Sequence, residues 1–205
     1  MKVRVYDNKA IISGYVNVAE RISKRLKENG IEFYEKIKEG AFGDAVRRNN
    51  NIKILLNHDY KRELGNTNQN LTIYEDSIGL YAEAEITDEE VVMKARNNQL
   101  SGWSFGFVPL KEEINENYGN IPLRTVESLN LYEVSILDSD HIPAYNSMSL
   151  NVRDAANEPL EIRSYEKINI EVEEEKPPKE EELQRDFDNS IFIAEIDKFL
   201  NERKK

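Results

Sequence analysis

The sequence is poor in the residues that build disulfide scaffolds, metal centres and membrane spans. It contains no cysteine and only two histidines, His58 and His141. These scarcities exclude a disulfide framework, a cysteine nucleophile and cysteine-ligated metals, and they leave almost no room for a multi-histidine metal site. No segment approaches the roughly 20 apolar residues of a membrane span, and the N-terminus lacks the apolar region of a secretory signal. We therefore expect a soluble intracellular protein.

Positive charge is also in short supply. The 205 residues include 28 Lys+Arg against 39 Asp+Glu, so the formal net charge is -11. An acidic surface repels both phosphate and anionic lipid, which predicts no nucleic-acid partner and no membrane partner. The length is sufficient for one domain with a substantial core, together with an appendage.

A shift in composition near residue 150 predicts three parts. Residues 1–150 form the main domain, 151–182 an acidic linker and 183–205 a C-terminal helical segment. The linker contains EVEEEKPPKEEE, in which like charges repel and prolines lack a backbone donor. The last part has apolar residues at helical intervals. It is either a short surface helix or, in the interpretation we prefer, a segment that docks on a partner.

The hydrophobic pattern of the first 150 residues predicts more strands than helices. Strand patterns occur at Lys2–Tyr6, Ala10–Val16, Asn51–His58, Leu71–Tyr74, Gly79–Ile86, Leu100–Pro109 and Leu129–Leu137. Helices are expected at 18–29, at Glu39–Asn49 and from a Thr87 N-cap to Asn98, where Glu90 has capping-box spacing. The predicted fold class is α+β: a β-rich barrel of about six to seven strands flanked by a few helices, with a charged C-terminal extension.

The strand LSGWSFGFV places a serine in an unusually open position. Side chains alternate along a strand, so Ser104 shares its face with Gly102 and Gly106. Glycine within a strand often marks the close approach of a ligand or of another backbone. Ser104 is therefore a candidate nucleophile. From this motif alone, we favour the structural interpretation, in which the glycines admit a neighbouring strand.

Two further segments supply a base and an acid. His58 ends the apolar pattern of NIKILLNH, where a half-buried imidazole can accept a proton near neutral pH; a lone histidine is more often structural. Glu133 lies between leucines in a strand, and a buried carboxylate needs a partner. That partner is a histidine or, alternatively, an arginine or lysine. Asp59 is a weaker candidate, because adjacent strand residues point to opposite faces.

Six segments occur in an order that resembles a known family. They are GYVNVAERISK, EKIKEGAFGDAV, ILLNHDYKRELGNT, GLYAEAEI, LSGWSFGF and LYEVSIL…PAYNSM. Over about residues 1–150 they resemble the prohead (capsid-maturation) serine proteases of tailed bacteriophages, which are related to the herpesvirus assemblin proteases. The resemblance implies a β-barrel flanked by helices, with His58, Ser104 and Glu133 as catalytic residues. His141 is the alternative third member, because the assemblins use a second histidine. No metal or organic cofactor is implied.

The same resemblance implies a function. A serine endopeptidase of this family cleaves scaffolding protein, the N-terminal segment of the major capsid protein and itself, inside the procapsid in the cytoplasm of the bacterial host. The resemblance to the assemblins also implies a homodimer. The C-terminal tail is a candidate for self-cleavage. The alternatives are a protease fold without activity, a β-barrel binding module in capsid assembly and, from the acidic composition, a glycosidase that uses Glu83 and Glu133.

Overall fold

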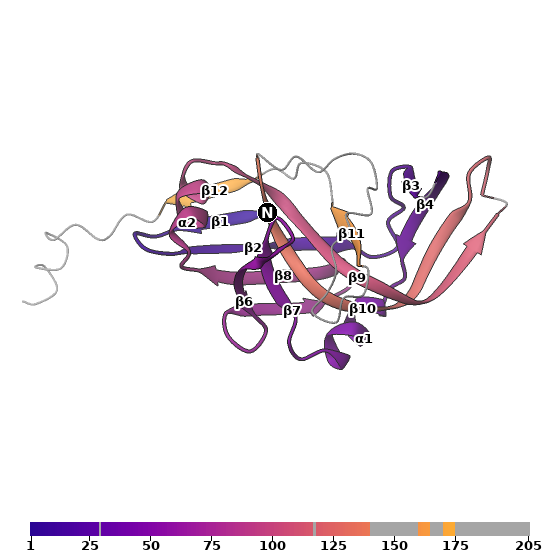
Figure 1. Cartoon of the computed structure of the whole chain (residues 1–205), viewed down its shortest axis with the longest axis horizontal. Coiled ribbons are helices and arrows are strands. Elements are labelled where there is room, and N and C mark those ends of the chain that lie inside the picture. The colour runs from indigo at the N-terminus through magenta and orange to yellow at the C-terminus, as the bar shows by residue number, and fades with distance from the viewer. Residues whose placement is uncertain (29, 117, 140–159, 165–169, 175–205) are drawn as a thin grey trace, which may run out of the picture. The chain divides into compact units, whose positions relative to one another are not determined.

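The computed structural model describes residues 1–28, 30–116, 118–139, 160–164 and 170–174 (Figure 1). Within these ranges, one sheet has five strands. In spatial order they are β12 (Glu171–Glu174), β1 (Lys2–Val5), β2 (Ala10–Val18), β8 (Gly79–Ile86) and β7 (Leu71–Glu75).

The second sheet holds the remaining described strands. Its main path is β11 (Glu161–Ser164), β9 (Leu100–Asn115), β10 (Leu123–Asp138), β4 (Ile31–Ile37) and β3 (Leu26–Glu28). Off this path, β5 (Lys53–Leu56) pairs with both β10 and β6 (Asp59–Asn66). The described helices are α1 (Ala41–Arg48) and α2 (Glu89–Arg96).

Strand β10 is the centre of the second sheet, and Figure 1 shows it beside the equally long β9. The two strands pair antiparallel over most of their length. The other edge of β10 is shared, because β4 pairs parallel with its beginning and β5 pairs parallel with its end. Between these two ladders, Arg48 and Asn49 at the end of α1 donate to the carbonyls of Leu129 and Leu131. The α1 connection thereby satisfies backbone acceptors that neither strand reaches.

The core forms on one face of β9. Trp103, Phe105 and Phe107 alternate along the strand and are fully buried. Phe42 from α1 packs edge-on against Phe105, with 5.4 Å between the ring centroids. Burial of such aromatic side chains contributes roughly 2–3 kcal/mol each, so β9 is a rigid support for the residues on its opposite face.

The α+β prediction with a strand-rich core is confirmed, but the expected closed barrel is wrong. Closure would require each outer strand to pair on both edges. Among the described residues, β3, β6, β7, β11 and β12 each pair with a single neighbour, so both sheets are open. Alternating hydrophobicity shows which face of a strand is buried, and it carries no information on which strands meet at a sheet edge.

The helix expected at 18–29 is also wrong. Strand β2 continues to Val18, and β3 begins at Leu26. The segment lacks an apolar stripe wide enough to bury a helix face, and Ile22 is 39 % exposed. The helices expected at Glu39–Asn49 and after residue 87 correspond to α1 and α2.

Part of the predicted linker is built into the sheets. Strand β11 pairs antiparallel with β9, and β12 pairs parallel with β1. Leu160 and Ile170 are the other described residues of the predicted linker 151–182. The structure does not describe the rest of that linker, the segment 183–205 or His141. Within the part of the chain that the structure describes, no helix has the length and apolar character needed to cross a membrane.

Candidate active site

His58 lies in a tight turn between β5 and β6. Strand β5 ends at Leu56 and β6 begins at Asp59, so Asn57 and His58 are the two turn residues. Both have a positive φ, 54° for Asn57 and 62° for His58, which is typical of a type I′ hairpin. The Asn57 side chain accepts a hydrogen bond from the Asp138 N–H over 3.1 Å, which joins the turn to the end of β10. His58 is therefore a turn residue rather than the last residue of a strand, and only 9 % of it is exposed.

The fully buried carboxylate of Glu133 is satisfied by two side chains. His58 Nδ1 lies 2.8 Å from Oε1, and the Ser135 hydroxyl donates to Oε2 over 2.6 Å. Because an ionised carboxylate only accepts hydrogen bonds, this contact assigns the ring proton to Nδ1 of His58. In the neutral imidazole with this tautomer, Nε2 carries the free lone pair that a general base requires.

Ser135 is a member of this network that the sequence analysis missed. Its hydroxyl oxygen accepts the His58 backbone N–H over 3.2 Å while the hydroxyl donates to Glu133. The signal available in the sequence was the two-residue spacing of Glu133 and Ser135, which places both on one face of a strand. Ser135 therefore connects the backbone of the turn to the carboxylate that holds its imidazole.

Ser104 lies directly across from this network on β9. The register pairs Ser104 with Ser135 and Gly106 with Glu133, so these side chains belong to the same face of the sheet. A Cβ atom at Gly106 would lie 2.4 Å from Glu133 Oε1. Gly106, the neighbour of Ser104 on this face of β9, therefore provides the space that the Glu133 carboxylate occupies.

The Ser104 hydroxyl is engaged with β11. Its Oγ donates to the Arg163 carbonyl over 2.8 Å, and Ser104 is fully buried. Of the hydrogen bonds among described residues, none joins Ser104 to His58. The structure thus brings His58 into contact with Glu133 and aligns Ser104 with Ser135 across the β9–β10 ladder, while β11 holds the serine hydroxyl.

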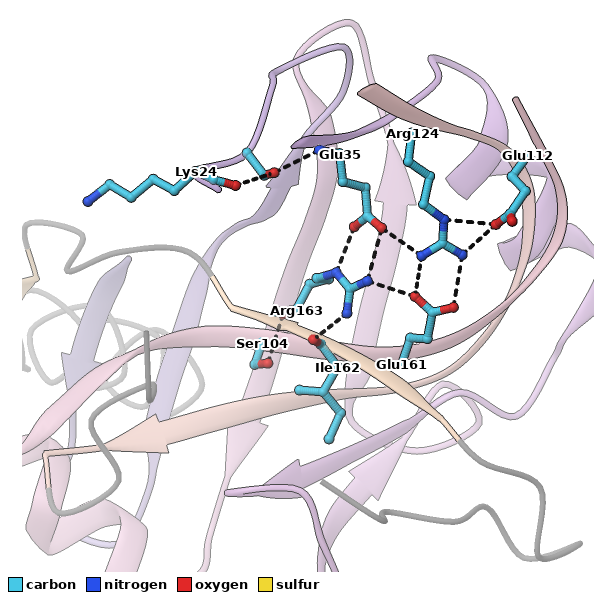
Figure 2. Close-up of polar contacts among 9 residues, drawn as sticks. Lys24, Glu35, Ser104, Glu112, Arg124, Glu161, Ile162 and Arg163 are labelled. Carbon is cyan, nitrogen blue, oxygen red and sulfur yellow. Dashed lines mark hydrogen bonds and ion pairs between the residues drawn. The ribbon is translucent and has the colours of Figure 1, made fainter. Parts of the chain in front are cut away.

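A cluster of charged side chains flanks Ser104, as Figure 2 shows. Arg163 pairs with Glu35 through two hydrogen bonds of 2.7 and 2.9 Å, and Arg124 donates to Glu35 over 3.0 Å. Arg124 also binds Glu161 and Glu112. We call these five residues, Glu35, Glu112, Arg124, Glu161 and Arg163, the guanidinium–carboxylate cluster.

Ion pairing within this cluster explains how its side chains remain ionised although they are poorly solvated. Burial alone would lower the pKa of Arg124, yet the hydrogen bond to Glu161 and the charge of Glu35 outweigh it and raise this pKa. Burial would likewise raise the pKa of Glu161, but its bonds to Arg124 and Arg163 hold the pKa below its usual value. The sequence analysis did not identify the cluster, because its members come from four strands that are distant in sequence.

The other candidates lie elsewhere. Asp59 is exposed and accepts the Lys61 N–H, and Glu83 lies on β8 of the other sheet with Arg4 3.6 Å away. The carboxylate pair of the glycosidase alternative is therefore split between two sheets. The described residues contain no group of three or more His, Asp or Glu side chains arranged to hold a metal ion.

Comparison with known proteins identifies the family of the chain. Neither a search of curated proteins nor a search of solved structures finds a significantly similar protein. The family model described as caudovirus prohead serine protease matches residues 1–161, which include His58, Ser104 and Glu133. Because this match covers most of the chain, the protein belongs to the caudovirus prohead serine proteases, a family of capsid-maturation proteases.

Proposed function

We propose that this chain is a serine endopeptidase in which Ser104 is the nucleophile, His58 the general base and Glu133 the residue that orients His58. The observation that carries the proposal is the 2.8 Å contact between His58 Nδ1 and the buried carboxylate of Glu133. Such a contact fixes the imidazole tautomer and stabilises the imidazolium formed during acyl transfer. The His58–Glu133 pair lies where β5 and β9 flank β10. Ser104 lies on β9 beside this pair, and its neighbours on the same face of the strand are Gly102 and Gly106. This position supports the assignment of Ser104.

The reaction follows from these positions. Once its hydroxyl leaves the Arg163 carbonyl, Ser104 Oγ attacks a peptide carbonyl carbon while Nε2 of His58 takes the hydroxyl proton. The peptide C–N bond then breaks, and His58 returns the proton to the departing amine. Water, activated by the same imidazole, hydrolyses the acyl-enzyme and regenerates Ser104. Throughout the reaction, Oε1 of Glu133 accepts a hydrogen bond from Nδ1–H of His58, and the Ser135 hydroxyl donates to Oε2.

Family membership supports the choice of substrates. We propose that the chain cleaves scaffolding protein, the N-terminal segment of the major capsid protein and itself. This activity would take place inside the procapsid, in the cytoplasm of the bacterial host. We propose that the self-cleavage site lies within residues 151–205, a range whose acidic sequence includes EVEEEKPPKEEE.

Covalent labelling tests the proposal directly. The wild type, Ser104→Ala and Ser101→Ala are each incubated, concentrated and at neutral pH, with a fluorophosphonate, and intact masses are followed. We expect a single adduct on the wild type and on Ser101→Ala, and none on Ser104→Ala. Parallel samples without the reagent should show Ser104-dependent loss of tail fragments.

Ser101→Ala is the matched control, because Ser101 lies on the same strand and its hydroxyl donates to the Asp138 carbonyl, away from Glu133 and Arg163. Equal labelling of the wild type and Ser104→Ala would contradict the assignment of the nucleophile. An unlabelled and unchanged wild type would favour the protease fold without activity.

A further inference from the structure

Strand β11 lies where an extended substrate chain would have to bind. One edge of β9 is taken by β10, and β11 adds to the other edge opposite Ser104–Phe107. Many proteins bind extended peptides by this kind of strand addition, in which backbone hydrogen bonds give affinity and side-chain pockets give specificity. The family match ends at Glu161, the first residue of β11, so Arg163 and Ser164 lie just beyond the matched region.

The register of β11 brings one peptide bond to the proposed nucleophile. Ser164 is paired with Ser104, and the carbonyl of Arg163 accepts the Ser104 hydroxyl over 2.8 Å. The bond between Arg163 and Ser164 is therefore the part of β11 nearest to Ser104 Oγ. A substrate chain in the same register would present the carbonyl of its corresponding residue to the serine.

Glu35 holds the side chain of that residue. Its two carboxylate oxygens accept Nε and Nη2 of Arg163, and the guanidinium lies over the Phe107 ring at 5.5 Å from its centroid. The side chains of Glu35 and Arg163 are only 4 % and 12 % exposed. Two parallel bonds to a planar guanidinium give geometric selectivity as well as energy.

The position of Glu35 is fixed independently of β11. Its backbone N–H donates to the Ser23 hydroxyl over 2.9 Å, and the Ser23 N–H donates to the Glu35 carbonyl. Figure 2 shows the carboxylate of Glu35 between the guanidinium groups of Arg124 and Arg163. Arg124, opposite Glu35 in the β4–β10 ladder, holds the same carboxylate. Glu35 is thus part of a preformed site.

The charges of the site match the charges of β11. Without β11, the cluster contains Glu35, Glu112 and Arg124, which is one negative charge in excess. Strand β11 supplies Arg163 to Glu35 and Glu161 to Arg124, two positions apart and therefore on one side of the strand. Glu35 keeps the contact with Arg124 when β11 is absent, but the excess negative charge of Glu35 and Glu112 favours a chain that brings a cation with the planar geometry to pair with the free side of the Glu35 carboxylate.

We infer that β11 occupies the substrate position of this protease, and that Glu35 and Arg124 select chains with an acidic residue two positions before an arginine or lysine. The inference rests on the proposed function in taking Ser104 as the nucleophile and His58 as the group that transfers its proton. Cleavage then follows the basic residue: its carbonyl carbon bonds to Ser104 Oγ, its C–N bond breaks, and His58 passes the serine proton to the new amine. Because β11 is tethered at an effective concentration on the order of mM, it competes with every other substrate chain.

Peptide binding tests this inference without any turnover. The full-length chain carries Ser104→Ala to prevent cleavage and Arg163→Gln to weaken β11. A fluorescent peptide with the sequence of residues 160–166, LEIRSYE, is titrated by anisotropy, alongside peptides with lysine or glutamine in place of its arginine. We expect the glutamine peptide to bind about tenfold more weakly, or worse, than the arginine and lysine peptides. The arginine peptide should also bind about tenfold more weakly to the chain that retains Arg163.

A matched pair of variants assigns the selectivity to Glu35. Adding Glu35→Gln should abolish the preference for arginine over glutamine. Adding Glu32→Gln should preserve it, because Glu32 lies on the same strand but is exposed and pairs with Arg25. Circular dichroism confirms that both variants are folded, and the peptide series is informative even if one of them is not.

The outcomes separate this inference from the proposed function. Equal binding of the arginine and glutamine peptides, a preference that survives Glu35→Gln, or no binding of any peptide would overturn the inference. Fluorophosphonate labelling of Ser104 would still support the proposed function in each of these cases. Arginine-dependent binding without labelling of Ser104 would instead support β11's position as a peptide-binding site and contradict the role of Ser104 as the nucleophile.

Discussion

At the scale of single residues, the His58–Glu133–Ser135 network explains how a carboxylate is held in a dry core. Both oxygens of Glu133 are paired, since one receives Nδ1 of His58 and the other the Ser135 hydroxyl. Removing one of these donors would leave a buried carboxylate oxygen unpaired, which lowers the free energy of unfolding by several kcal/mol. The strained backbone of His58, with a φ of 62°, is maintained because Asn57 and Ser135 tie the turn to β10.

Gly106 supplies the space for this network, which leads to a prediction. The variant Gly106→Ala places a Cβ atom 2.4 Å from Glu133 Oε1. We expect it to lower the free energy of unfolding by about 1–3 kcal/mol and to weaken the proposed peptidase activity. Urea denaturation and an assay of self-cleavage would measure the two effects.

A double-mutant cycle isolates the cause. In a Glu133→Ala background the obstructing carboxylate is gone, so Gly106→Ala should cost much less than in the wild type. We expect a coupling energy of about 1 kcal/mol or more. Additive effects of the two substitutions would show that Gly106 is required for another reason.

At the scale of elements, short helices and long strands contribute in different ways. Strands β9 and β10 are supported along their whole length by each other and by the aromatic core. Helix α2 has eight residues, and its stability depends on its ends and on the packing of Val91 and Ala95. The sequence predicted Thr87 as the N-cap, whereas the structure shows that Asp88 has this role, because its carboxylate accepts the Val91 N–H over 3.0 Å.

The two neighbouring residues provide a matched test of this cap. Asp88→Ala should lower the free energy of unfolding by about 1 kcal/mol, because an orphan N–H of the first helical turn loses its acceptor. Thr87→Ala should change it by less than about 0.5 kcal/mol, as is usual for an exposed residue. Thermal unfolding of the two variants beside the wild type would measure the difference. A larger loss for Thr87→Ala would restore the capping box that the sequence suggested.

At the scale of the whole molecule, an excess of acidic residues makes stability depend on a few well-placed cations. The formal net charge is -11, and Arg124 and Arg163 form ion pairs with three carboxylates within one cluster. The pKa of Glu161 lies below its usual value because its bonds to Arg124 and Arg163 outweigh burial. A depressed pKa means that the folded state holds the Glu161 proton less tightly than the unfolded state. The contribution to stability is therefore complete above the unfolded pKa and is lost as pH falls through the folded pKa.

This sign predicts how Glu161→Gln changes the pH profile. The variant should be less stable than the wild type by about 1 kcal/mol at pH 7. The difference should shrink as pH falls below the ordinary glutamate pKa of about 4.5, since the wild type then becomes protonated at this position. Urea denaturation from pH 7 to 3 would measure the difference. Glu173→Gln is the control, because the pair that Glu173 forms with Lys2 is exposed. A gap between wild type and Glu161→Gln that stays constant with pH would contradict the assigned role of Glu161.

The sequence alone was informative wherever a pattern is local. The positions of most strands, the aromatic face of β9 and the strand-rich α+β class follow from alternating side chains. His58 and Glu133 became candidates because one residue type is scarce and the other sits among leucines, and the structure places the two in contact across 75 positions of sequence.

Tertiary structure decided everything that depends on which elements meet. The open sheets, the pairing of Ser135 with the turn, and the contact of Glu35 with Arg163 across 128 positions have no local signature. Periodicity specifies which face of an element is buried, but the partner on that face is chosen by the packing of the whole chain. The sequence by itself therefore determined the family, the strand-rich core and the candidate catalytic residues, whereas only the assembled sheet revealed that a segment taken for a linker lies against Ser104.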